Sequence, residues 1–196
     1  MTALGRHRGL WRSHAFSYDS LMNTPGRLVS LSHQHESSLE IFLSEFDANP
    51  DELHGYFCPR DSSIEQAVRL LQAWSHGEEI AAGHVPCSTW LWESEGVLQG
   101  VINVRHRLTP ALREVGGHVG YSVAKSHRRK GVGKAMLRDV LPYCQKLGIE
   151  RALLTCDSDN PASSRTIEAN RGELEREAWL ESAQRTQRWY WIDLSP

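Results

Sequence analysis

Three basic residues stand directly before a pair of glycines in the stretch Ser126-His-Arg-Arg-Lys-Gly-Val-Gly-Lys-Ala-Met-Leu137. Where a helix begins after such a turn, its first main-chain N–H groups lack partners, and the helix dipole adds about half a positive charge. Glycines let this main chain approach an anion closely, because they have no Cβ. The stretch therefore fits a phosphate or pyrophosphate. A structural turn with solvated basic side chains is the alternative.

Two familiar nucleotide-binding loops do not fit these residues. A P-loop requires a hydroxyl residue and a further glycine where Ala135 and Arg128 stand. A dinucleotide fingerprint requires a third glycine at the position of Met136. A nucleic-acid interface would need more than one short basic cluster in a chain whose formal net charge is −2. We therefore expect no nucleic-acid partner.

Hydrophobic periodicity predicts regular elements on both sides of the turn. A strand is expected over residues 116–124, directly before the turn, and an amphipathic helix over 131–147, directly after it. The other expected strands cover residues 27–31, 88–93, 97–105, 150–156, 174–180 and 187–194, and the other helices cover 38–46, 62–74 and 160–170. Strands and helices in this order indicate a mixed α/β (α+β) sheet.

Composition places the chain among ordinary globular proteins, with 40% hydrophobic and 23% charged residues in 196. We expect one domain over residues 27–196, and a flexible or non-native extension over 1–26, which is basic and almost free of acids. No apolar run approaches the roughly 20 residues that span a bilayer, so no membrane partner is expected. Four scattered cysteines indicate reduced thiols of a cytoplasmic protein. His33 and His35 have no third ligand in view, so no metal is expected.

The sequence Arg128-x-x-Gly131-x-Gly133, directly after Gly117-His-Val-Gly-Tyr-Ser-Val123, resembles the coenzyme-A-binding motif of the GNAT superfamily of N-acetyltransferases. Asn160-Pro-Ala-Ser163 is similar to the helix start that follows the fifth strand in that superfamily. Further stretches resemble a bacterial group of poorly characterised acetyltransferases: Val85-Pro-Cys-Ser-Thr-Trp90, Asn103-Val-Arg-His-Arg-Leu108, Gly116-Gly-His-Val-Gly-Tyr121 and Arg188-Trp-Tyr-Trp-Ile192. The resemblance covers residues 27–196.

The resemblance implies a GNAT fold, with a mixed central sheet of about seven strands, four or so helices, and a gap between the fourth and fifth strands. Acetyl-CoA would lie in the gap, with no metal, and would donate its acetyl group directly to an amine of a small molecule or peptide. A homodimer is compatible with it. The residues that would bind the cofactor are Val123, Arg128, Arg129, Lys130, Gly131, Val132, Gly133, Lys134, Asn160 and Ser163.

Two residues are candidates for proton transfer under this resemblance. His118 stands where many members carry a glutamate, so its imidazole could act as the base, or it could merely form a hydrogen bond inside the groove. The tyrosine that many members use as the acid is replaced by Ile167, so Tyr121 or water could supply that proton. The missing tyrosine keeps a second hypothesis open, in which the fold binds or senses acyl-CoA with little or no turnover.

Overall fold

The computed structural model describes residues 26–53 and 62–195. The strands and helices that periodicity predicts are confirmed, with small differences at their ends. In chain order the elements are β1 (Arg27–Val29), η2 (His33–His35), α1 (Glu36–Ser44), η3 (Pro50–Glu52), α2 (Ile64–His76), β2 (Cys87–Ser94), β3 (Val97–Arg105), α3 (Pro110–Glu114), β4 (Val119–Val123), η4 (Lys125–His127), α4 (Val132–Lys146), β5 (Arg151–Asp157), α5 (Pro161–Glu168), β6 (Glu173–Leu180) and β7 (Arg185–Asp193).

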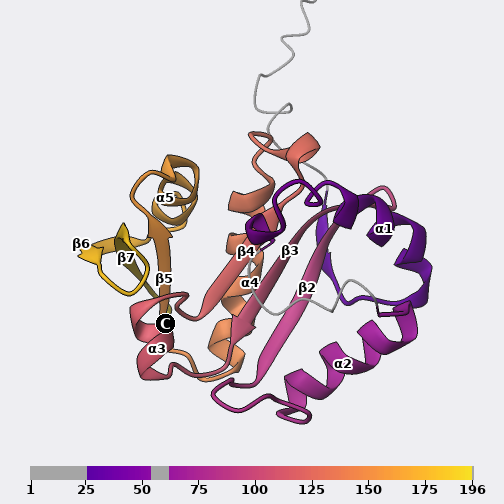
Figure 1. The fold of residues 1–196 in the computed structure, drawn as a ribbon, viewed down its shortest axis with the longest axis horizontal. Helices are drawn as coiled ribbons and strands as arrows, with labels where there is room; N and C mark the ends of the chain where they lie inside the picture. Colours follow the sequence, from indigo (N-terminus) through magenta and orange to yellow (C-terminus); the bar gives the residue numbers. More distant parts are fainter. Residues whose placement is uncertain (1–25, 54–61, 196) are drawn as a thin grey trace, which may run out of the picture.

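The seven strands form two sheets that divide between β4 and β5, as expected for a GNAT fold. One sheet has the order β1-β2-β3-β4 and the other β5-β7-β6, and neighbouring strands within each sheet are antiparallel. Figure 1 shows β5, β6, β7 and α5 on one side of the molecule and the larger sheet with α1 and α2 on the other. Strands β4 and β5 are thus edge strands, and their free edges face the division between the sheets.

Helix α4 packs against both sheets and holds them together. Its buried side chains Met136 and Val140 belong to one core cluster with Ile102 of β3, Leu154 of β5 and Tyr190 of β7. The packing on β3 is close, since a Cβ at Gly100 would lie 2.4 Å from Met136 Sδ. The opposite face of the larger sheet is covered by α1 and α2, whose apolar residues form a second cluster. Among the described cysteines, Cys87, Cys144 and Cys156 are buried free thiols.

The segment between β3 and β4 differs from the expected loop and long strand. It contains the short helix α3, which begins at Thr109, whose side chain accepts a hydrogen bond from Leu112 N–H. A threonine cap followed by proline is a helix-start signal that the sequence interpretation did not use. Strand β4 begins only at Val119, because Gly116 and Gly117 adopt φ values of +103° and +62°, outside the extended region.

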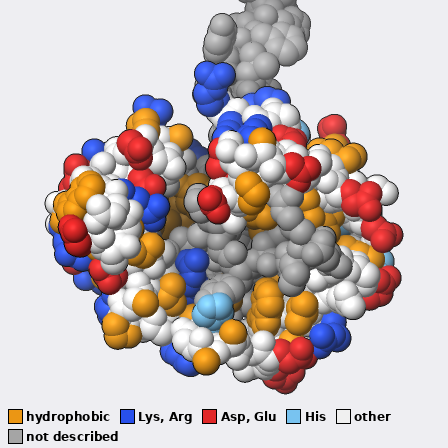
Figure 2. Space-filling view, in the orientation of Figure 1, with side chains coloured by type: hydrophobic (Ala, Val, Ile, Leu, Met, Phe, Trp, Pro, Cys, Tyr) orange, Lys and Arg blue, Asp and Glu red, His pale blue; other side chains and the backbone are white. Residues whose placement is uncertain are grey.

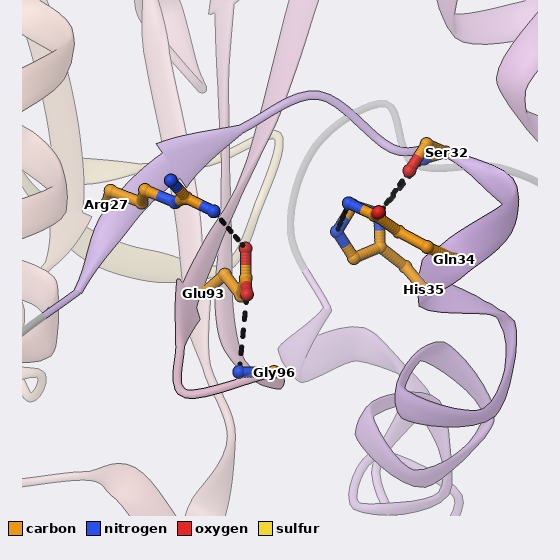
Figure 3. Close-up of polar contacts among 6 residues, drawn as sticks. All are labelled: Arg27, Ser32, Gln34, His35, Glu93 and Gly96. Carbon is orange, nitrogen blue, oxygen red and sulfur yellow. Dashed lines mark hydrogen bonds and ion pairs between the residues drawn. The ribbon is translucent and has the colours of Figure 1, made fainter.

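The corner between β1 and α1 contains His33 and His35, which were considered as metal ligands, and Figure 3 shows the surroundings of His35. His35 is buried, and its Nδ1 accepts a hydrogen bond of 3.0 Å from Ser32 N–H. Next to this corner, Glu93 accepts from Arg27 and from Gly96 N–H, which joins β1 to the β2–β3 turn. Over residues 26–53 and 62–195, no group of three or more His, Cys, Asp or Glu side chains is placed to hold a metal ion. Nor is any of the helices in these ranges long and apolar enough to cross a bilayer.

Candidate active site

The basic glycine turn lies between β4 and α4, at the open end of the division between the sheets. Gly131 is the N-cap of α4 with φ +83°, a left-handed conformation that favours glycine, and no described side chain caps the helix there. A Cβ at Gly133 would lie 3.6 Å from Val123 Cγ2 and 3.7 Å from Thr166, so the first turn of α4 faces both β4 and α5. Exposed basic side chains surround this helix end, namely Arg129, Lys130 and Lys134.

Arg128, predicted to bind the cofactor, is already engaged with protein groups. Its Nε donates to the Val123 carbonyl at 3.1 Å, and its guanidinium forms an ion pair with Glu52. The Arg128 guanidinium holds the pKa of the Glu52 carboxyl below its usual value. Glu52 belongs to η3, and its carbonyl also accepts from the Ser122 hydroxyl at 2.8 Å. Arg128 therefore fixes the turn to η3 as well as to β4.

The free edge of β4 presents main-chain groups to the gap. Arg105 N–H donates to the His118 carbonyl, and Ala124 N–H donates to the Gln99 carbonyl, so these residues form the hydrogen-bonded pairs between β3 and β4. In an antiparallel ladder the intervening residues direct their N–H and C=O groups the other way. The main-chain groups of Tyr121 and Val123 therefore point away from β3, along the edge where a bound chain could pair with them.

The Tyr121 side chain bridges the gap to the start of α5. Its hydroxyl lies 2.9 Å from Ser163 Oγ, while Ser163 N–H donates to the Asn160 side chain, which caps the helix. Burial raises the pKa of Tyr121 to about 12. The phenol therefore stays protonated at neutral pH and can donate. Ile167 is fully buried in the core, so the residue that replaces the usual tyrosine has no polar role.

His118 joins β4 to β5 at the closed end of the gap. The Leu153 N–H donates to His118 Nδ1 at 2.9 Å, and the His118 N–H donates to the Leu153 carbonyl at 2.7 Å. Burial, together with the charges of Arg113 and Arg105, lowers the pKa of His118 to about 4. The ring is therefore neutral at pH 7, and because Nδ1 is the acceptor, Nε2 carries the proton. That the ring acts as a base stays a prediction, and the tautomer that Leu153 selects does not favour it.

The two glycines before His118 allow this close approach of the sheets. A Cβ at Gly117 would lie 2.3 Å from the Leu153 carbonyl oxygen, which a side chain could not relieve without moving main chain. Gly116 N–H donates to Thr155 Oγ1 at 2.9 Å, and the Arg105 guanidinium donates to the carbonyls of both glycines. Sequence interpretation placed these glycines inside a strand and missed the joint that they form.

Buried polar side chains line the face of β3 and β4 that α1 and α2 cover. Asn103 pairs with Gly120 in the ladder, and a Cβ at Gly120 would lie 3.3 Å from Asn103 Oδ1 and 3.5 Å from the Arg105 guanidinium. Four buried polar residues lie on these two strands, namely Gln99, Asn103, Arg105 and Ser122, and a fifth, His118, directly precedes β4. Figure 2 shows basic and histidine side chains close together near the centre of the view. A polar surface of this kind can recognise a polar acceptor.

Comparison with known proteins shows the family by sequence and the fold by structure. Residues 41–172 match the model of the acetyltransferase (GNAT) family. The mouse protein N-acetyltransferase family 8 member 3 is 35% identical over 75 residues, which cover 38% of this chain and 33% of that protein. The alignment thus spans about a third of the length of the curated relatives that match.

Two solved structures share the fold with a TM-score of 0.60. One is YncA from Salmonella typhimurium with its cofactor acetyl-CoA, 13% identical, with 88% of this chain and 95% of that chain covered. The other is the microcin C7 self-immunity acetyltransferase MccE in complex with acetyl-CoA and AMP, 15% identical, with 88% and 94% covered. At these identities the likeness concerns the fold.

Proposed function

Because the chain belongs to the acetyltransferase (GNAT) family, we propose that it transfers the acetyl group of acetyl-CoA to an amine of a small molecule or peptide. The observation that carries the proposal is the glycine-containing, uncapped start of α4 at the open end of the gap between β4 and β5. The acetyl-CoA named with two structures of the same fold supports the choice of donor. The polar face of β3 and β4 is the proposed acceptor side.

The residues around the turn fit the charged half of acetyl-CoA. The main-chain N–H groups of residues 129–134 would hold the pyrophosphate, with Gly131 and Gly133 admitting it and the side chains of Arg129, Lys130 and Lys134 adding positive charge. The edge groups of Tyr121 and Val123 would pair with the amide-containing arm. Arg128 and Asn160 would act mainly by holding the turn and the start of α5, since their polar atoms already bind protein groups.

The reaction would depend on positioning the thioester beside the amine and on one proton donor. Acetyl-CoA supplies an activated thioester, and holding it beside the amine replaces a bimolecular encounter. Tyr121 is the proposed donor to the leaving sulfur, because its hydroxyl stays protonated and lies on the gap beside Ser163. The amine proton would leave through water, since the proton on His118 Nε2 and the Leu153 N–H on Nδ1 occupy both ring nitrogens.

The proposed activity is tested by measuring both turnover and cofactor binding. Thiol release from acetyl-CoA is measured across a panel of primary amines, and CoA binding is measured by calorimetry on wild type and Gly133→Val. The branched side chain would occupy the space of the phosphate, so we expect at least about a tenfold loss of CoA affinity with folding intact. Equal affinity in the variant contradicts the assigned cofactor turn.

The substitution at Ile167 favours a second candidate, an acyl-CoA-binding or sensing module. Tight CoA binding that Gly133→Val abolishes, together with no thiol release above the background hydrolysis rate for any amine, would support this module. Thiol release that depends on the amine supports the transferase.

A further inference from the structure

A cavity of about 380 Å³ lies at the end of β4 opposite the cofactor turn. It is bordered by the segment after β3, by α3, by the start of β4 and by the start of β5, and none of its lining residues belongs to the turn or to α5. Its charged and titratable lining residues are His106, Arg107, Arg113, His118, Glu150 and Arg151. The lining therefore contains three arginines and one acidic residue, in a chain whose formal net charge is negative.

Among the described residues, the arginines of this cavity are not paired with a carboxylate, unlike several others on the surface. Arg128, Arg185 and Arg188, for example, each form an ion pair with a carboxylate. Within the described ranges neither Arg107 nor Arg113 forms one, and the Arg151 guanidinium lies over the Trp191 ring, 4.9 Å from its centroid. The positive charges of Arg113 and Arg105 act on His118, since both help to lower its pKa. The cavity thus has donors in excess of acceptors.

His118 contributes a buried donor to the same cavity. The residue is 8% exposed and lines the cavity, and Leu153 N–H fixes its neutral tautomer with the proton on Nε2. In the parts of the chain that the structure describes, no acceptor is bonded to Nε2. A buried N–H donor without a protein acceptor, beside guanidinium groups, fits a ligand that accepts hydrogen bonds and carries negative charge.

We propose that this cavity binds an anionic group of a small molecule, a carboxylate or a phosphate, through His118 Nε2–H and the guanidinium groups of Arg107 and Arg113. The site is separate from the cofactor turn, so the proposal stands whether or not the chain transfers acetyl groups. Because His118 also joins β4 to β5, an anion bound here would strengthen the joint at the closed end of the gap.

Nuclear magnetic resonance of the His118 ring tests the proposal directly. Inorganic phosphate and succinate are titrated in separate arms at constant ionic strength, with CoA added to occupy the cofactor turn. A bound anion stabilises the imidazolium, so we expect saturable shifts of the His118 signals and a higher His118 pKa at saturation. The charged and titratable groups that face this ring are Arg105, His106, Arg107, Arg113, Glu150 and Arg151, and all are present in both arms.

Substitutions distinguish specific binding in this cavity from nonspecific attraction of an anion to a basic surface. In Arg107→Gln/Arg113→Gln we expect at least about a tenfold weaker binding of whichever anion saturates. Arg69→Gln, an exposed arginine of α2, is the matched control and should bind as wild type does. Binding that is equal in the double variant and in Arg69→Gln, or an absence of saturable His118 shifts with both anions, overturns the proposal. The arm that saturates identifies the anion as a phosphate or a carboxylate.

Discussion

The Leu153 main-chain N–H donates a hydrogen bond to His118 Nδ1 at 2.9 Å, and this is one of the bonds that join the two sheets at the closed end of the gap. In a continuous sheet a main-chain carbonyl of the next strand would accept from such an N–H. Here an imidazole takes that place, so β4 and β5 can stay in contact at one end without continuing the ladder. The residue that the sequence suggested as a base is thus part of the framework of the gap.

Substitution of His118 should therefore lower the stability of the fold more than it lowers the catalytic rate. His118→Ala leaves a buried N–H without its acceptor, and we expect the free energy of unfolding to fall by about 1–3 kcal/mol. His118→Gln retains a side-chain acceptor and should lose less. Urea denaturation of the two variants measures the difference. If the ring were the base instead, both variants would lose turnover equally while their stabilities stayed close to that of wild type.

The low pKa of His118 also predicts how stability depends on pH. The ordinary histidine value is about 6.5 and the folded value is about 4, so the unfolded chain binds more protons between these limits. The stabilisation is complete above pH 6.5 and is lost as the pH falls towards 4, by up to about 1.4 kcal/mol per pH unit. Denaturation curves collected across this range should show the slope in wild type. The slope should be smaller in His118→Gln, whereas equal slopes would contradict the assignment.

Tyr121→Phe tests the proton donor. The change removes the hydroxyl but keeps the ring, so kcat should fall by about 10²-fold while the KM for acetyl-CoA changes little. Tyr143→Phe, on the exposed side of α4, is the control and should behave as wild type. An unchanged kcat in Tyr121→Phe would mean that water protonates the thiolate, and the hydroxyl would then serve only to contact Ser163.

The Arg128–Glu52 ion pair provides a test of whether Arg128 binds the CoA phosphates directly or only holds the cofactor turn in place. If Arg128 mainly fixes the turn, Arg128→Gln and Glu52→Gln break the same pair and should weaken CoA binding to a similar, small extent, of about 1 kcal/mol or less. A direct phosphate ligand would give a different pattern, in which Arg128→Gln is far more damaging. Calorimetric titration of CoA into both single variants and the double variant measures the coupling.

Much of the fold could be predicted because its signals are local. The periodicity of α4 and the alternation in β3 follow from side chains a few residues apart, and the glycines of the turn show where α4 begins. The joint at His118 could not be predicted in this way, because it depends on a contact with Leu153 far along the chain. The pair between Arg128 and Glu52 joins residues that are still farther apart, 76 positions against 35.

The structure places the candidate site residues, and their roles in binding and catalysis stay predictions. The residues that follow β4 do gather at the gap, and Tyr121 and Ser163 do meet across it. Their states depend on burial, which raises the pKa of Tyr121 and lowers that of His118. No short motif encodes that environment, since it is formed by α3, β3 and β5 together.

Gly117 lies at the closed end of the gap, where β4 and β5 come closest together. Its Cα lies so close to the Leu153 carbonyl that one added carbon would force the strands apart at the closed end. From there β4 runs for five residues towards the cofactor turn, about 17 Å at 3.3 Å per residue. A change in the angle between β4 and β5 at Gly117 would therefore change the width of the gap at the cofactor turn, although Gly117 itself lies at the other end of β4.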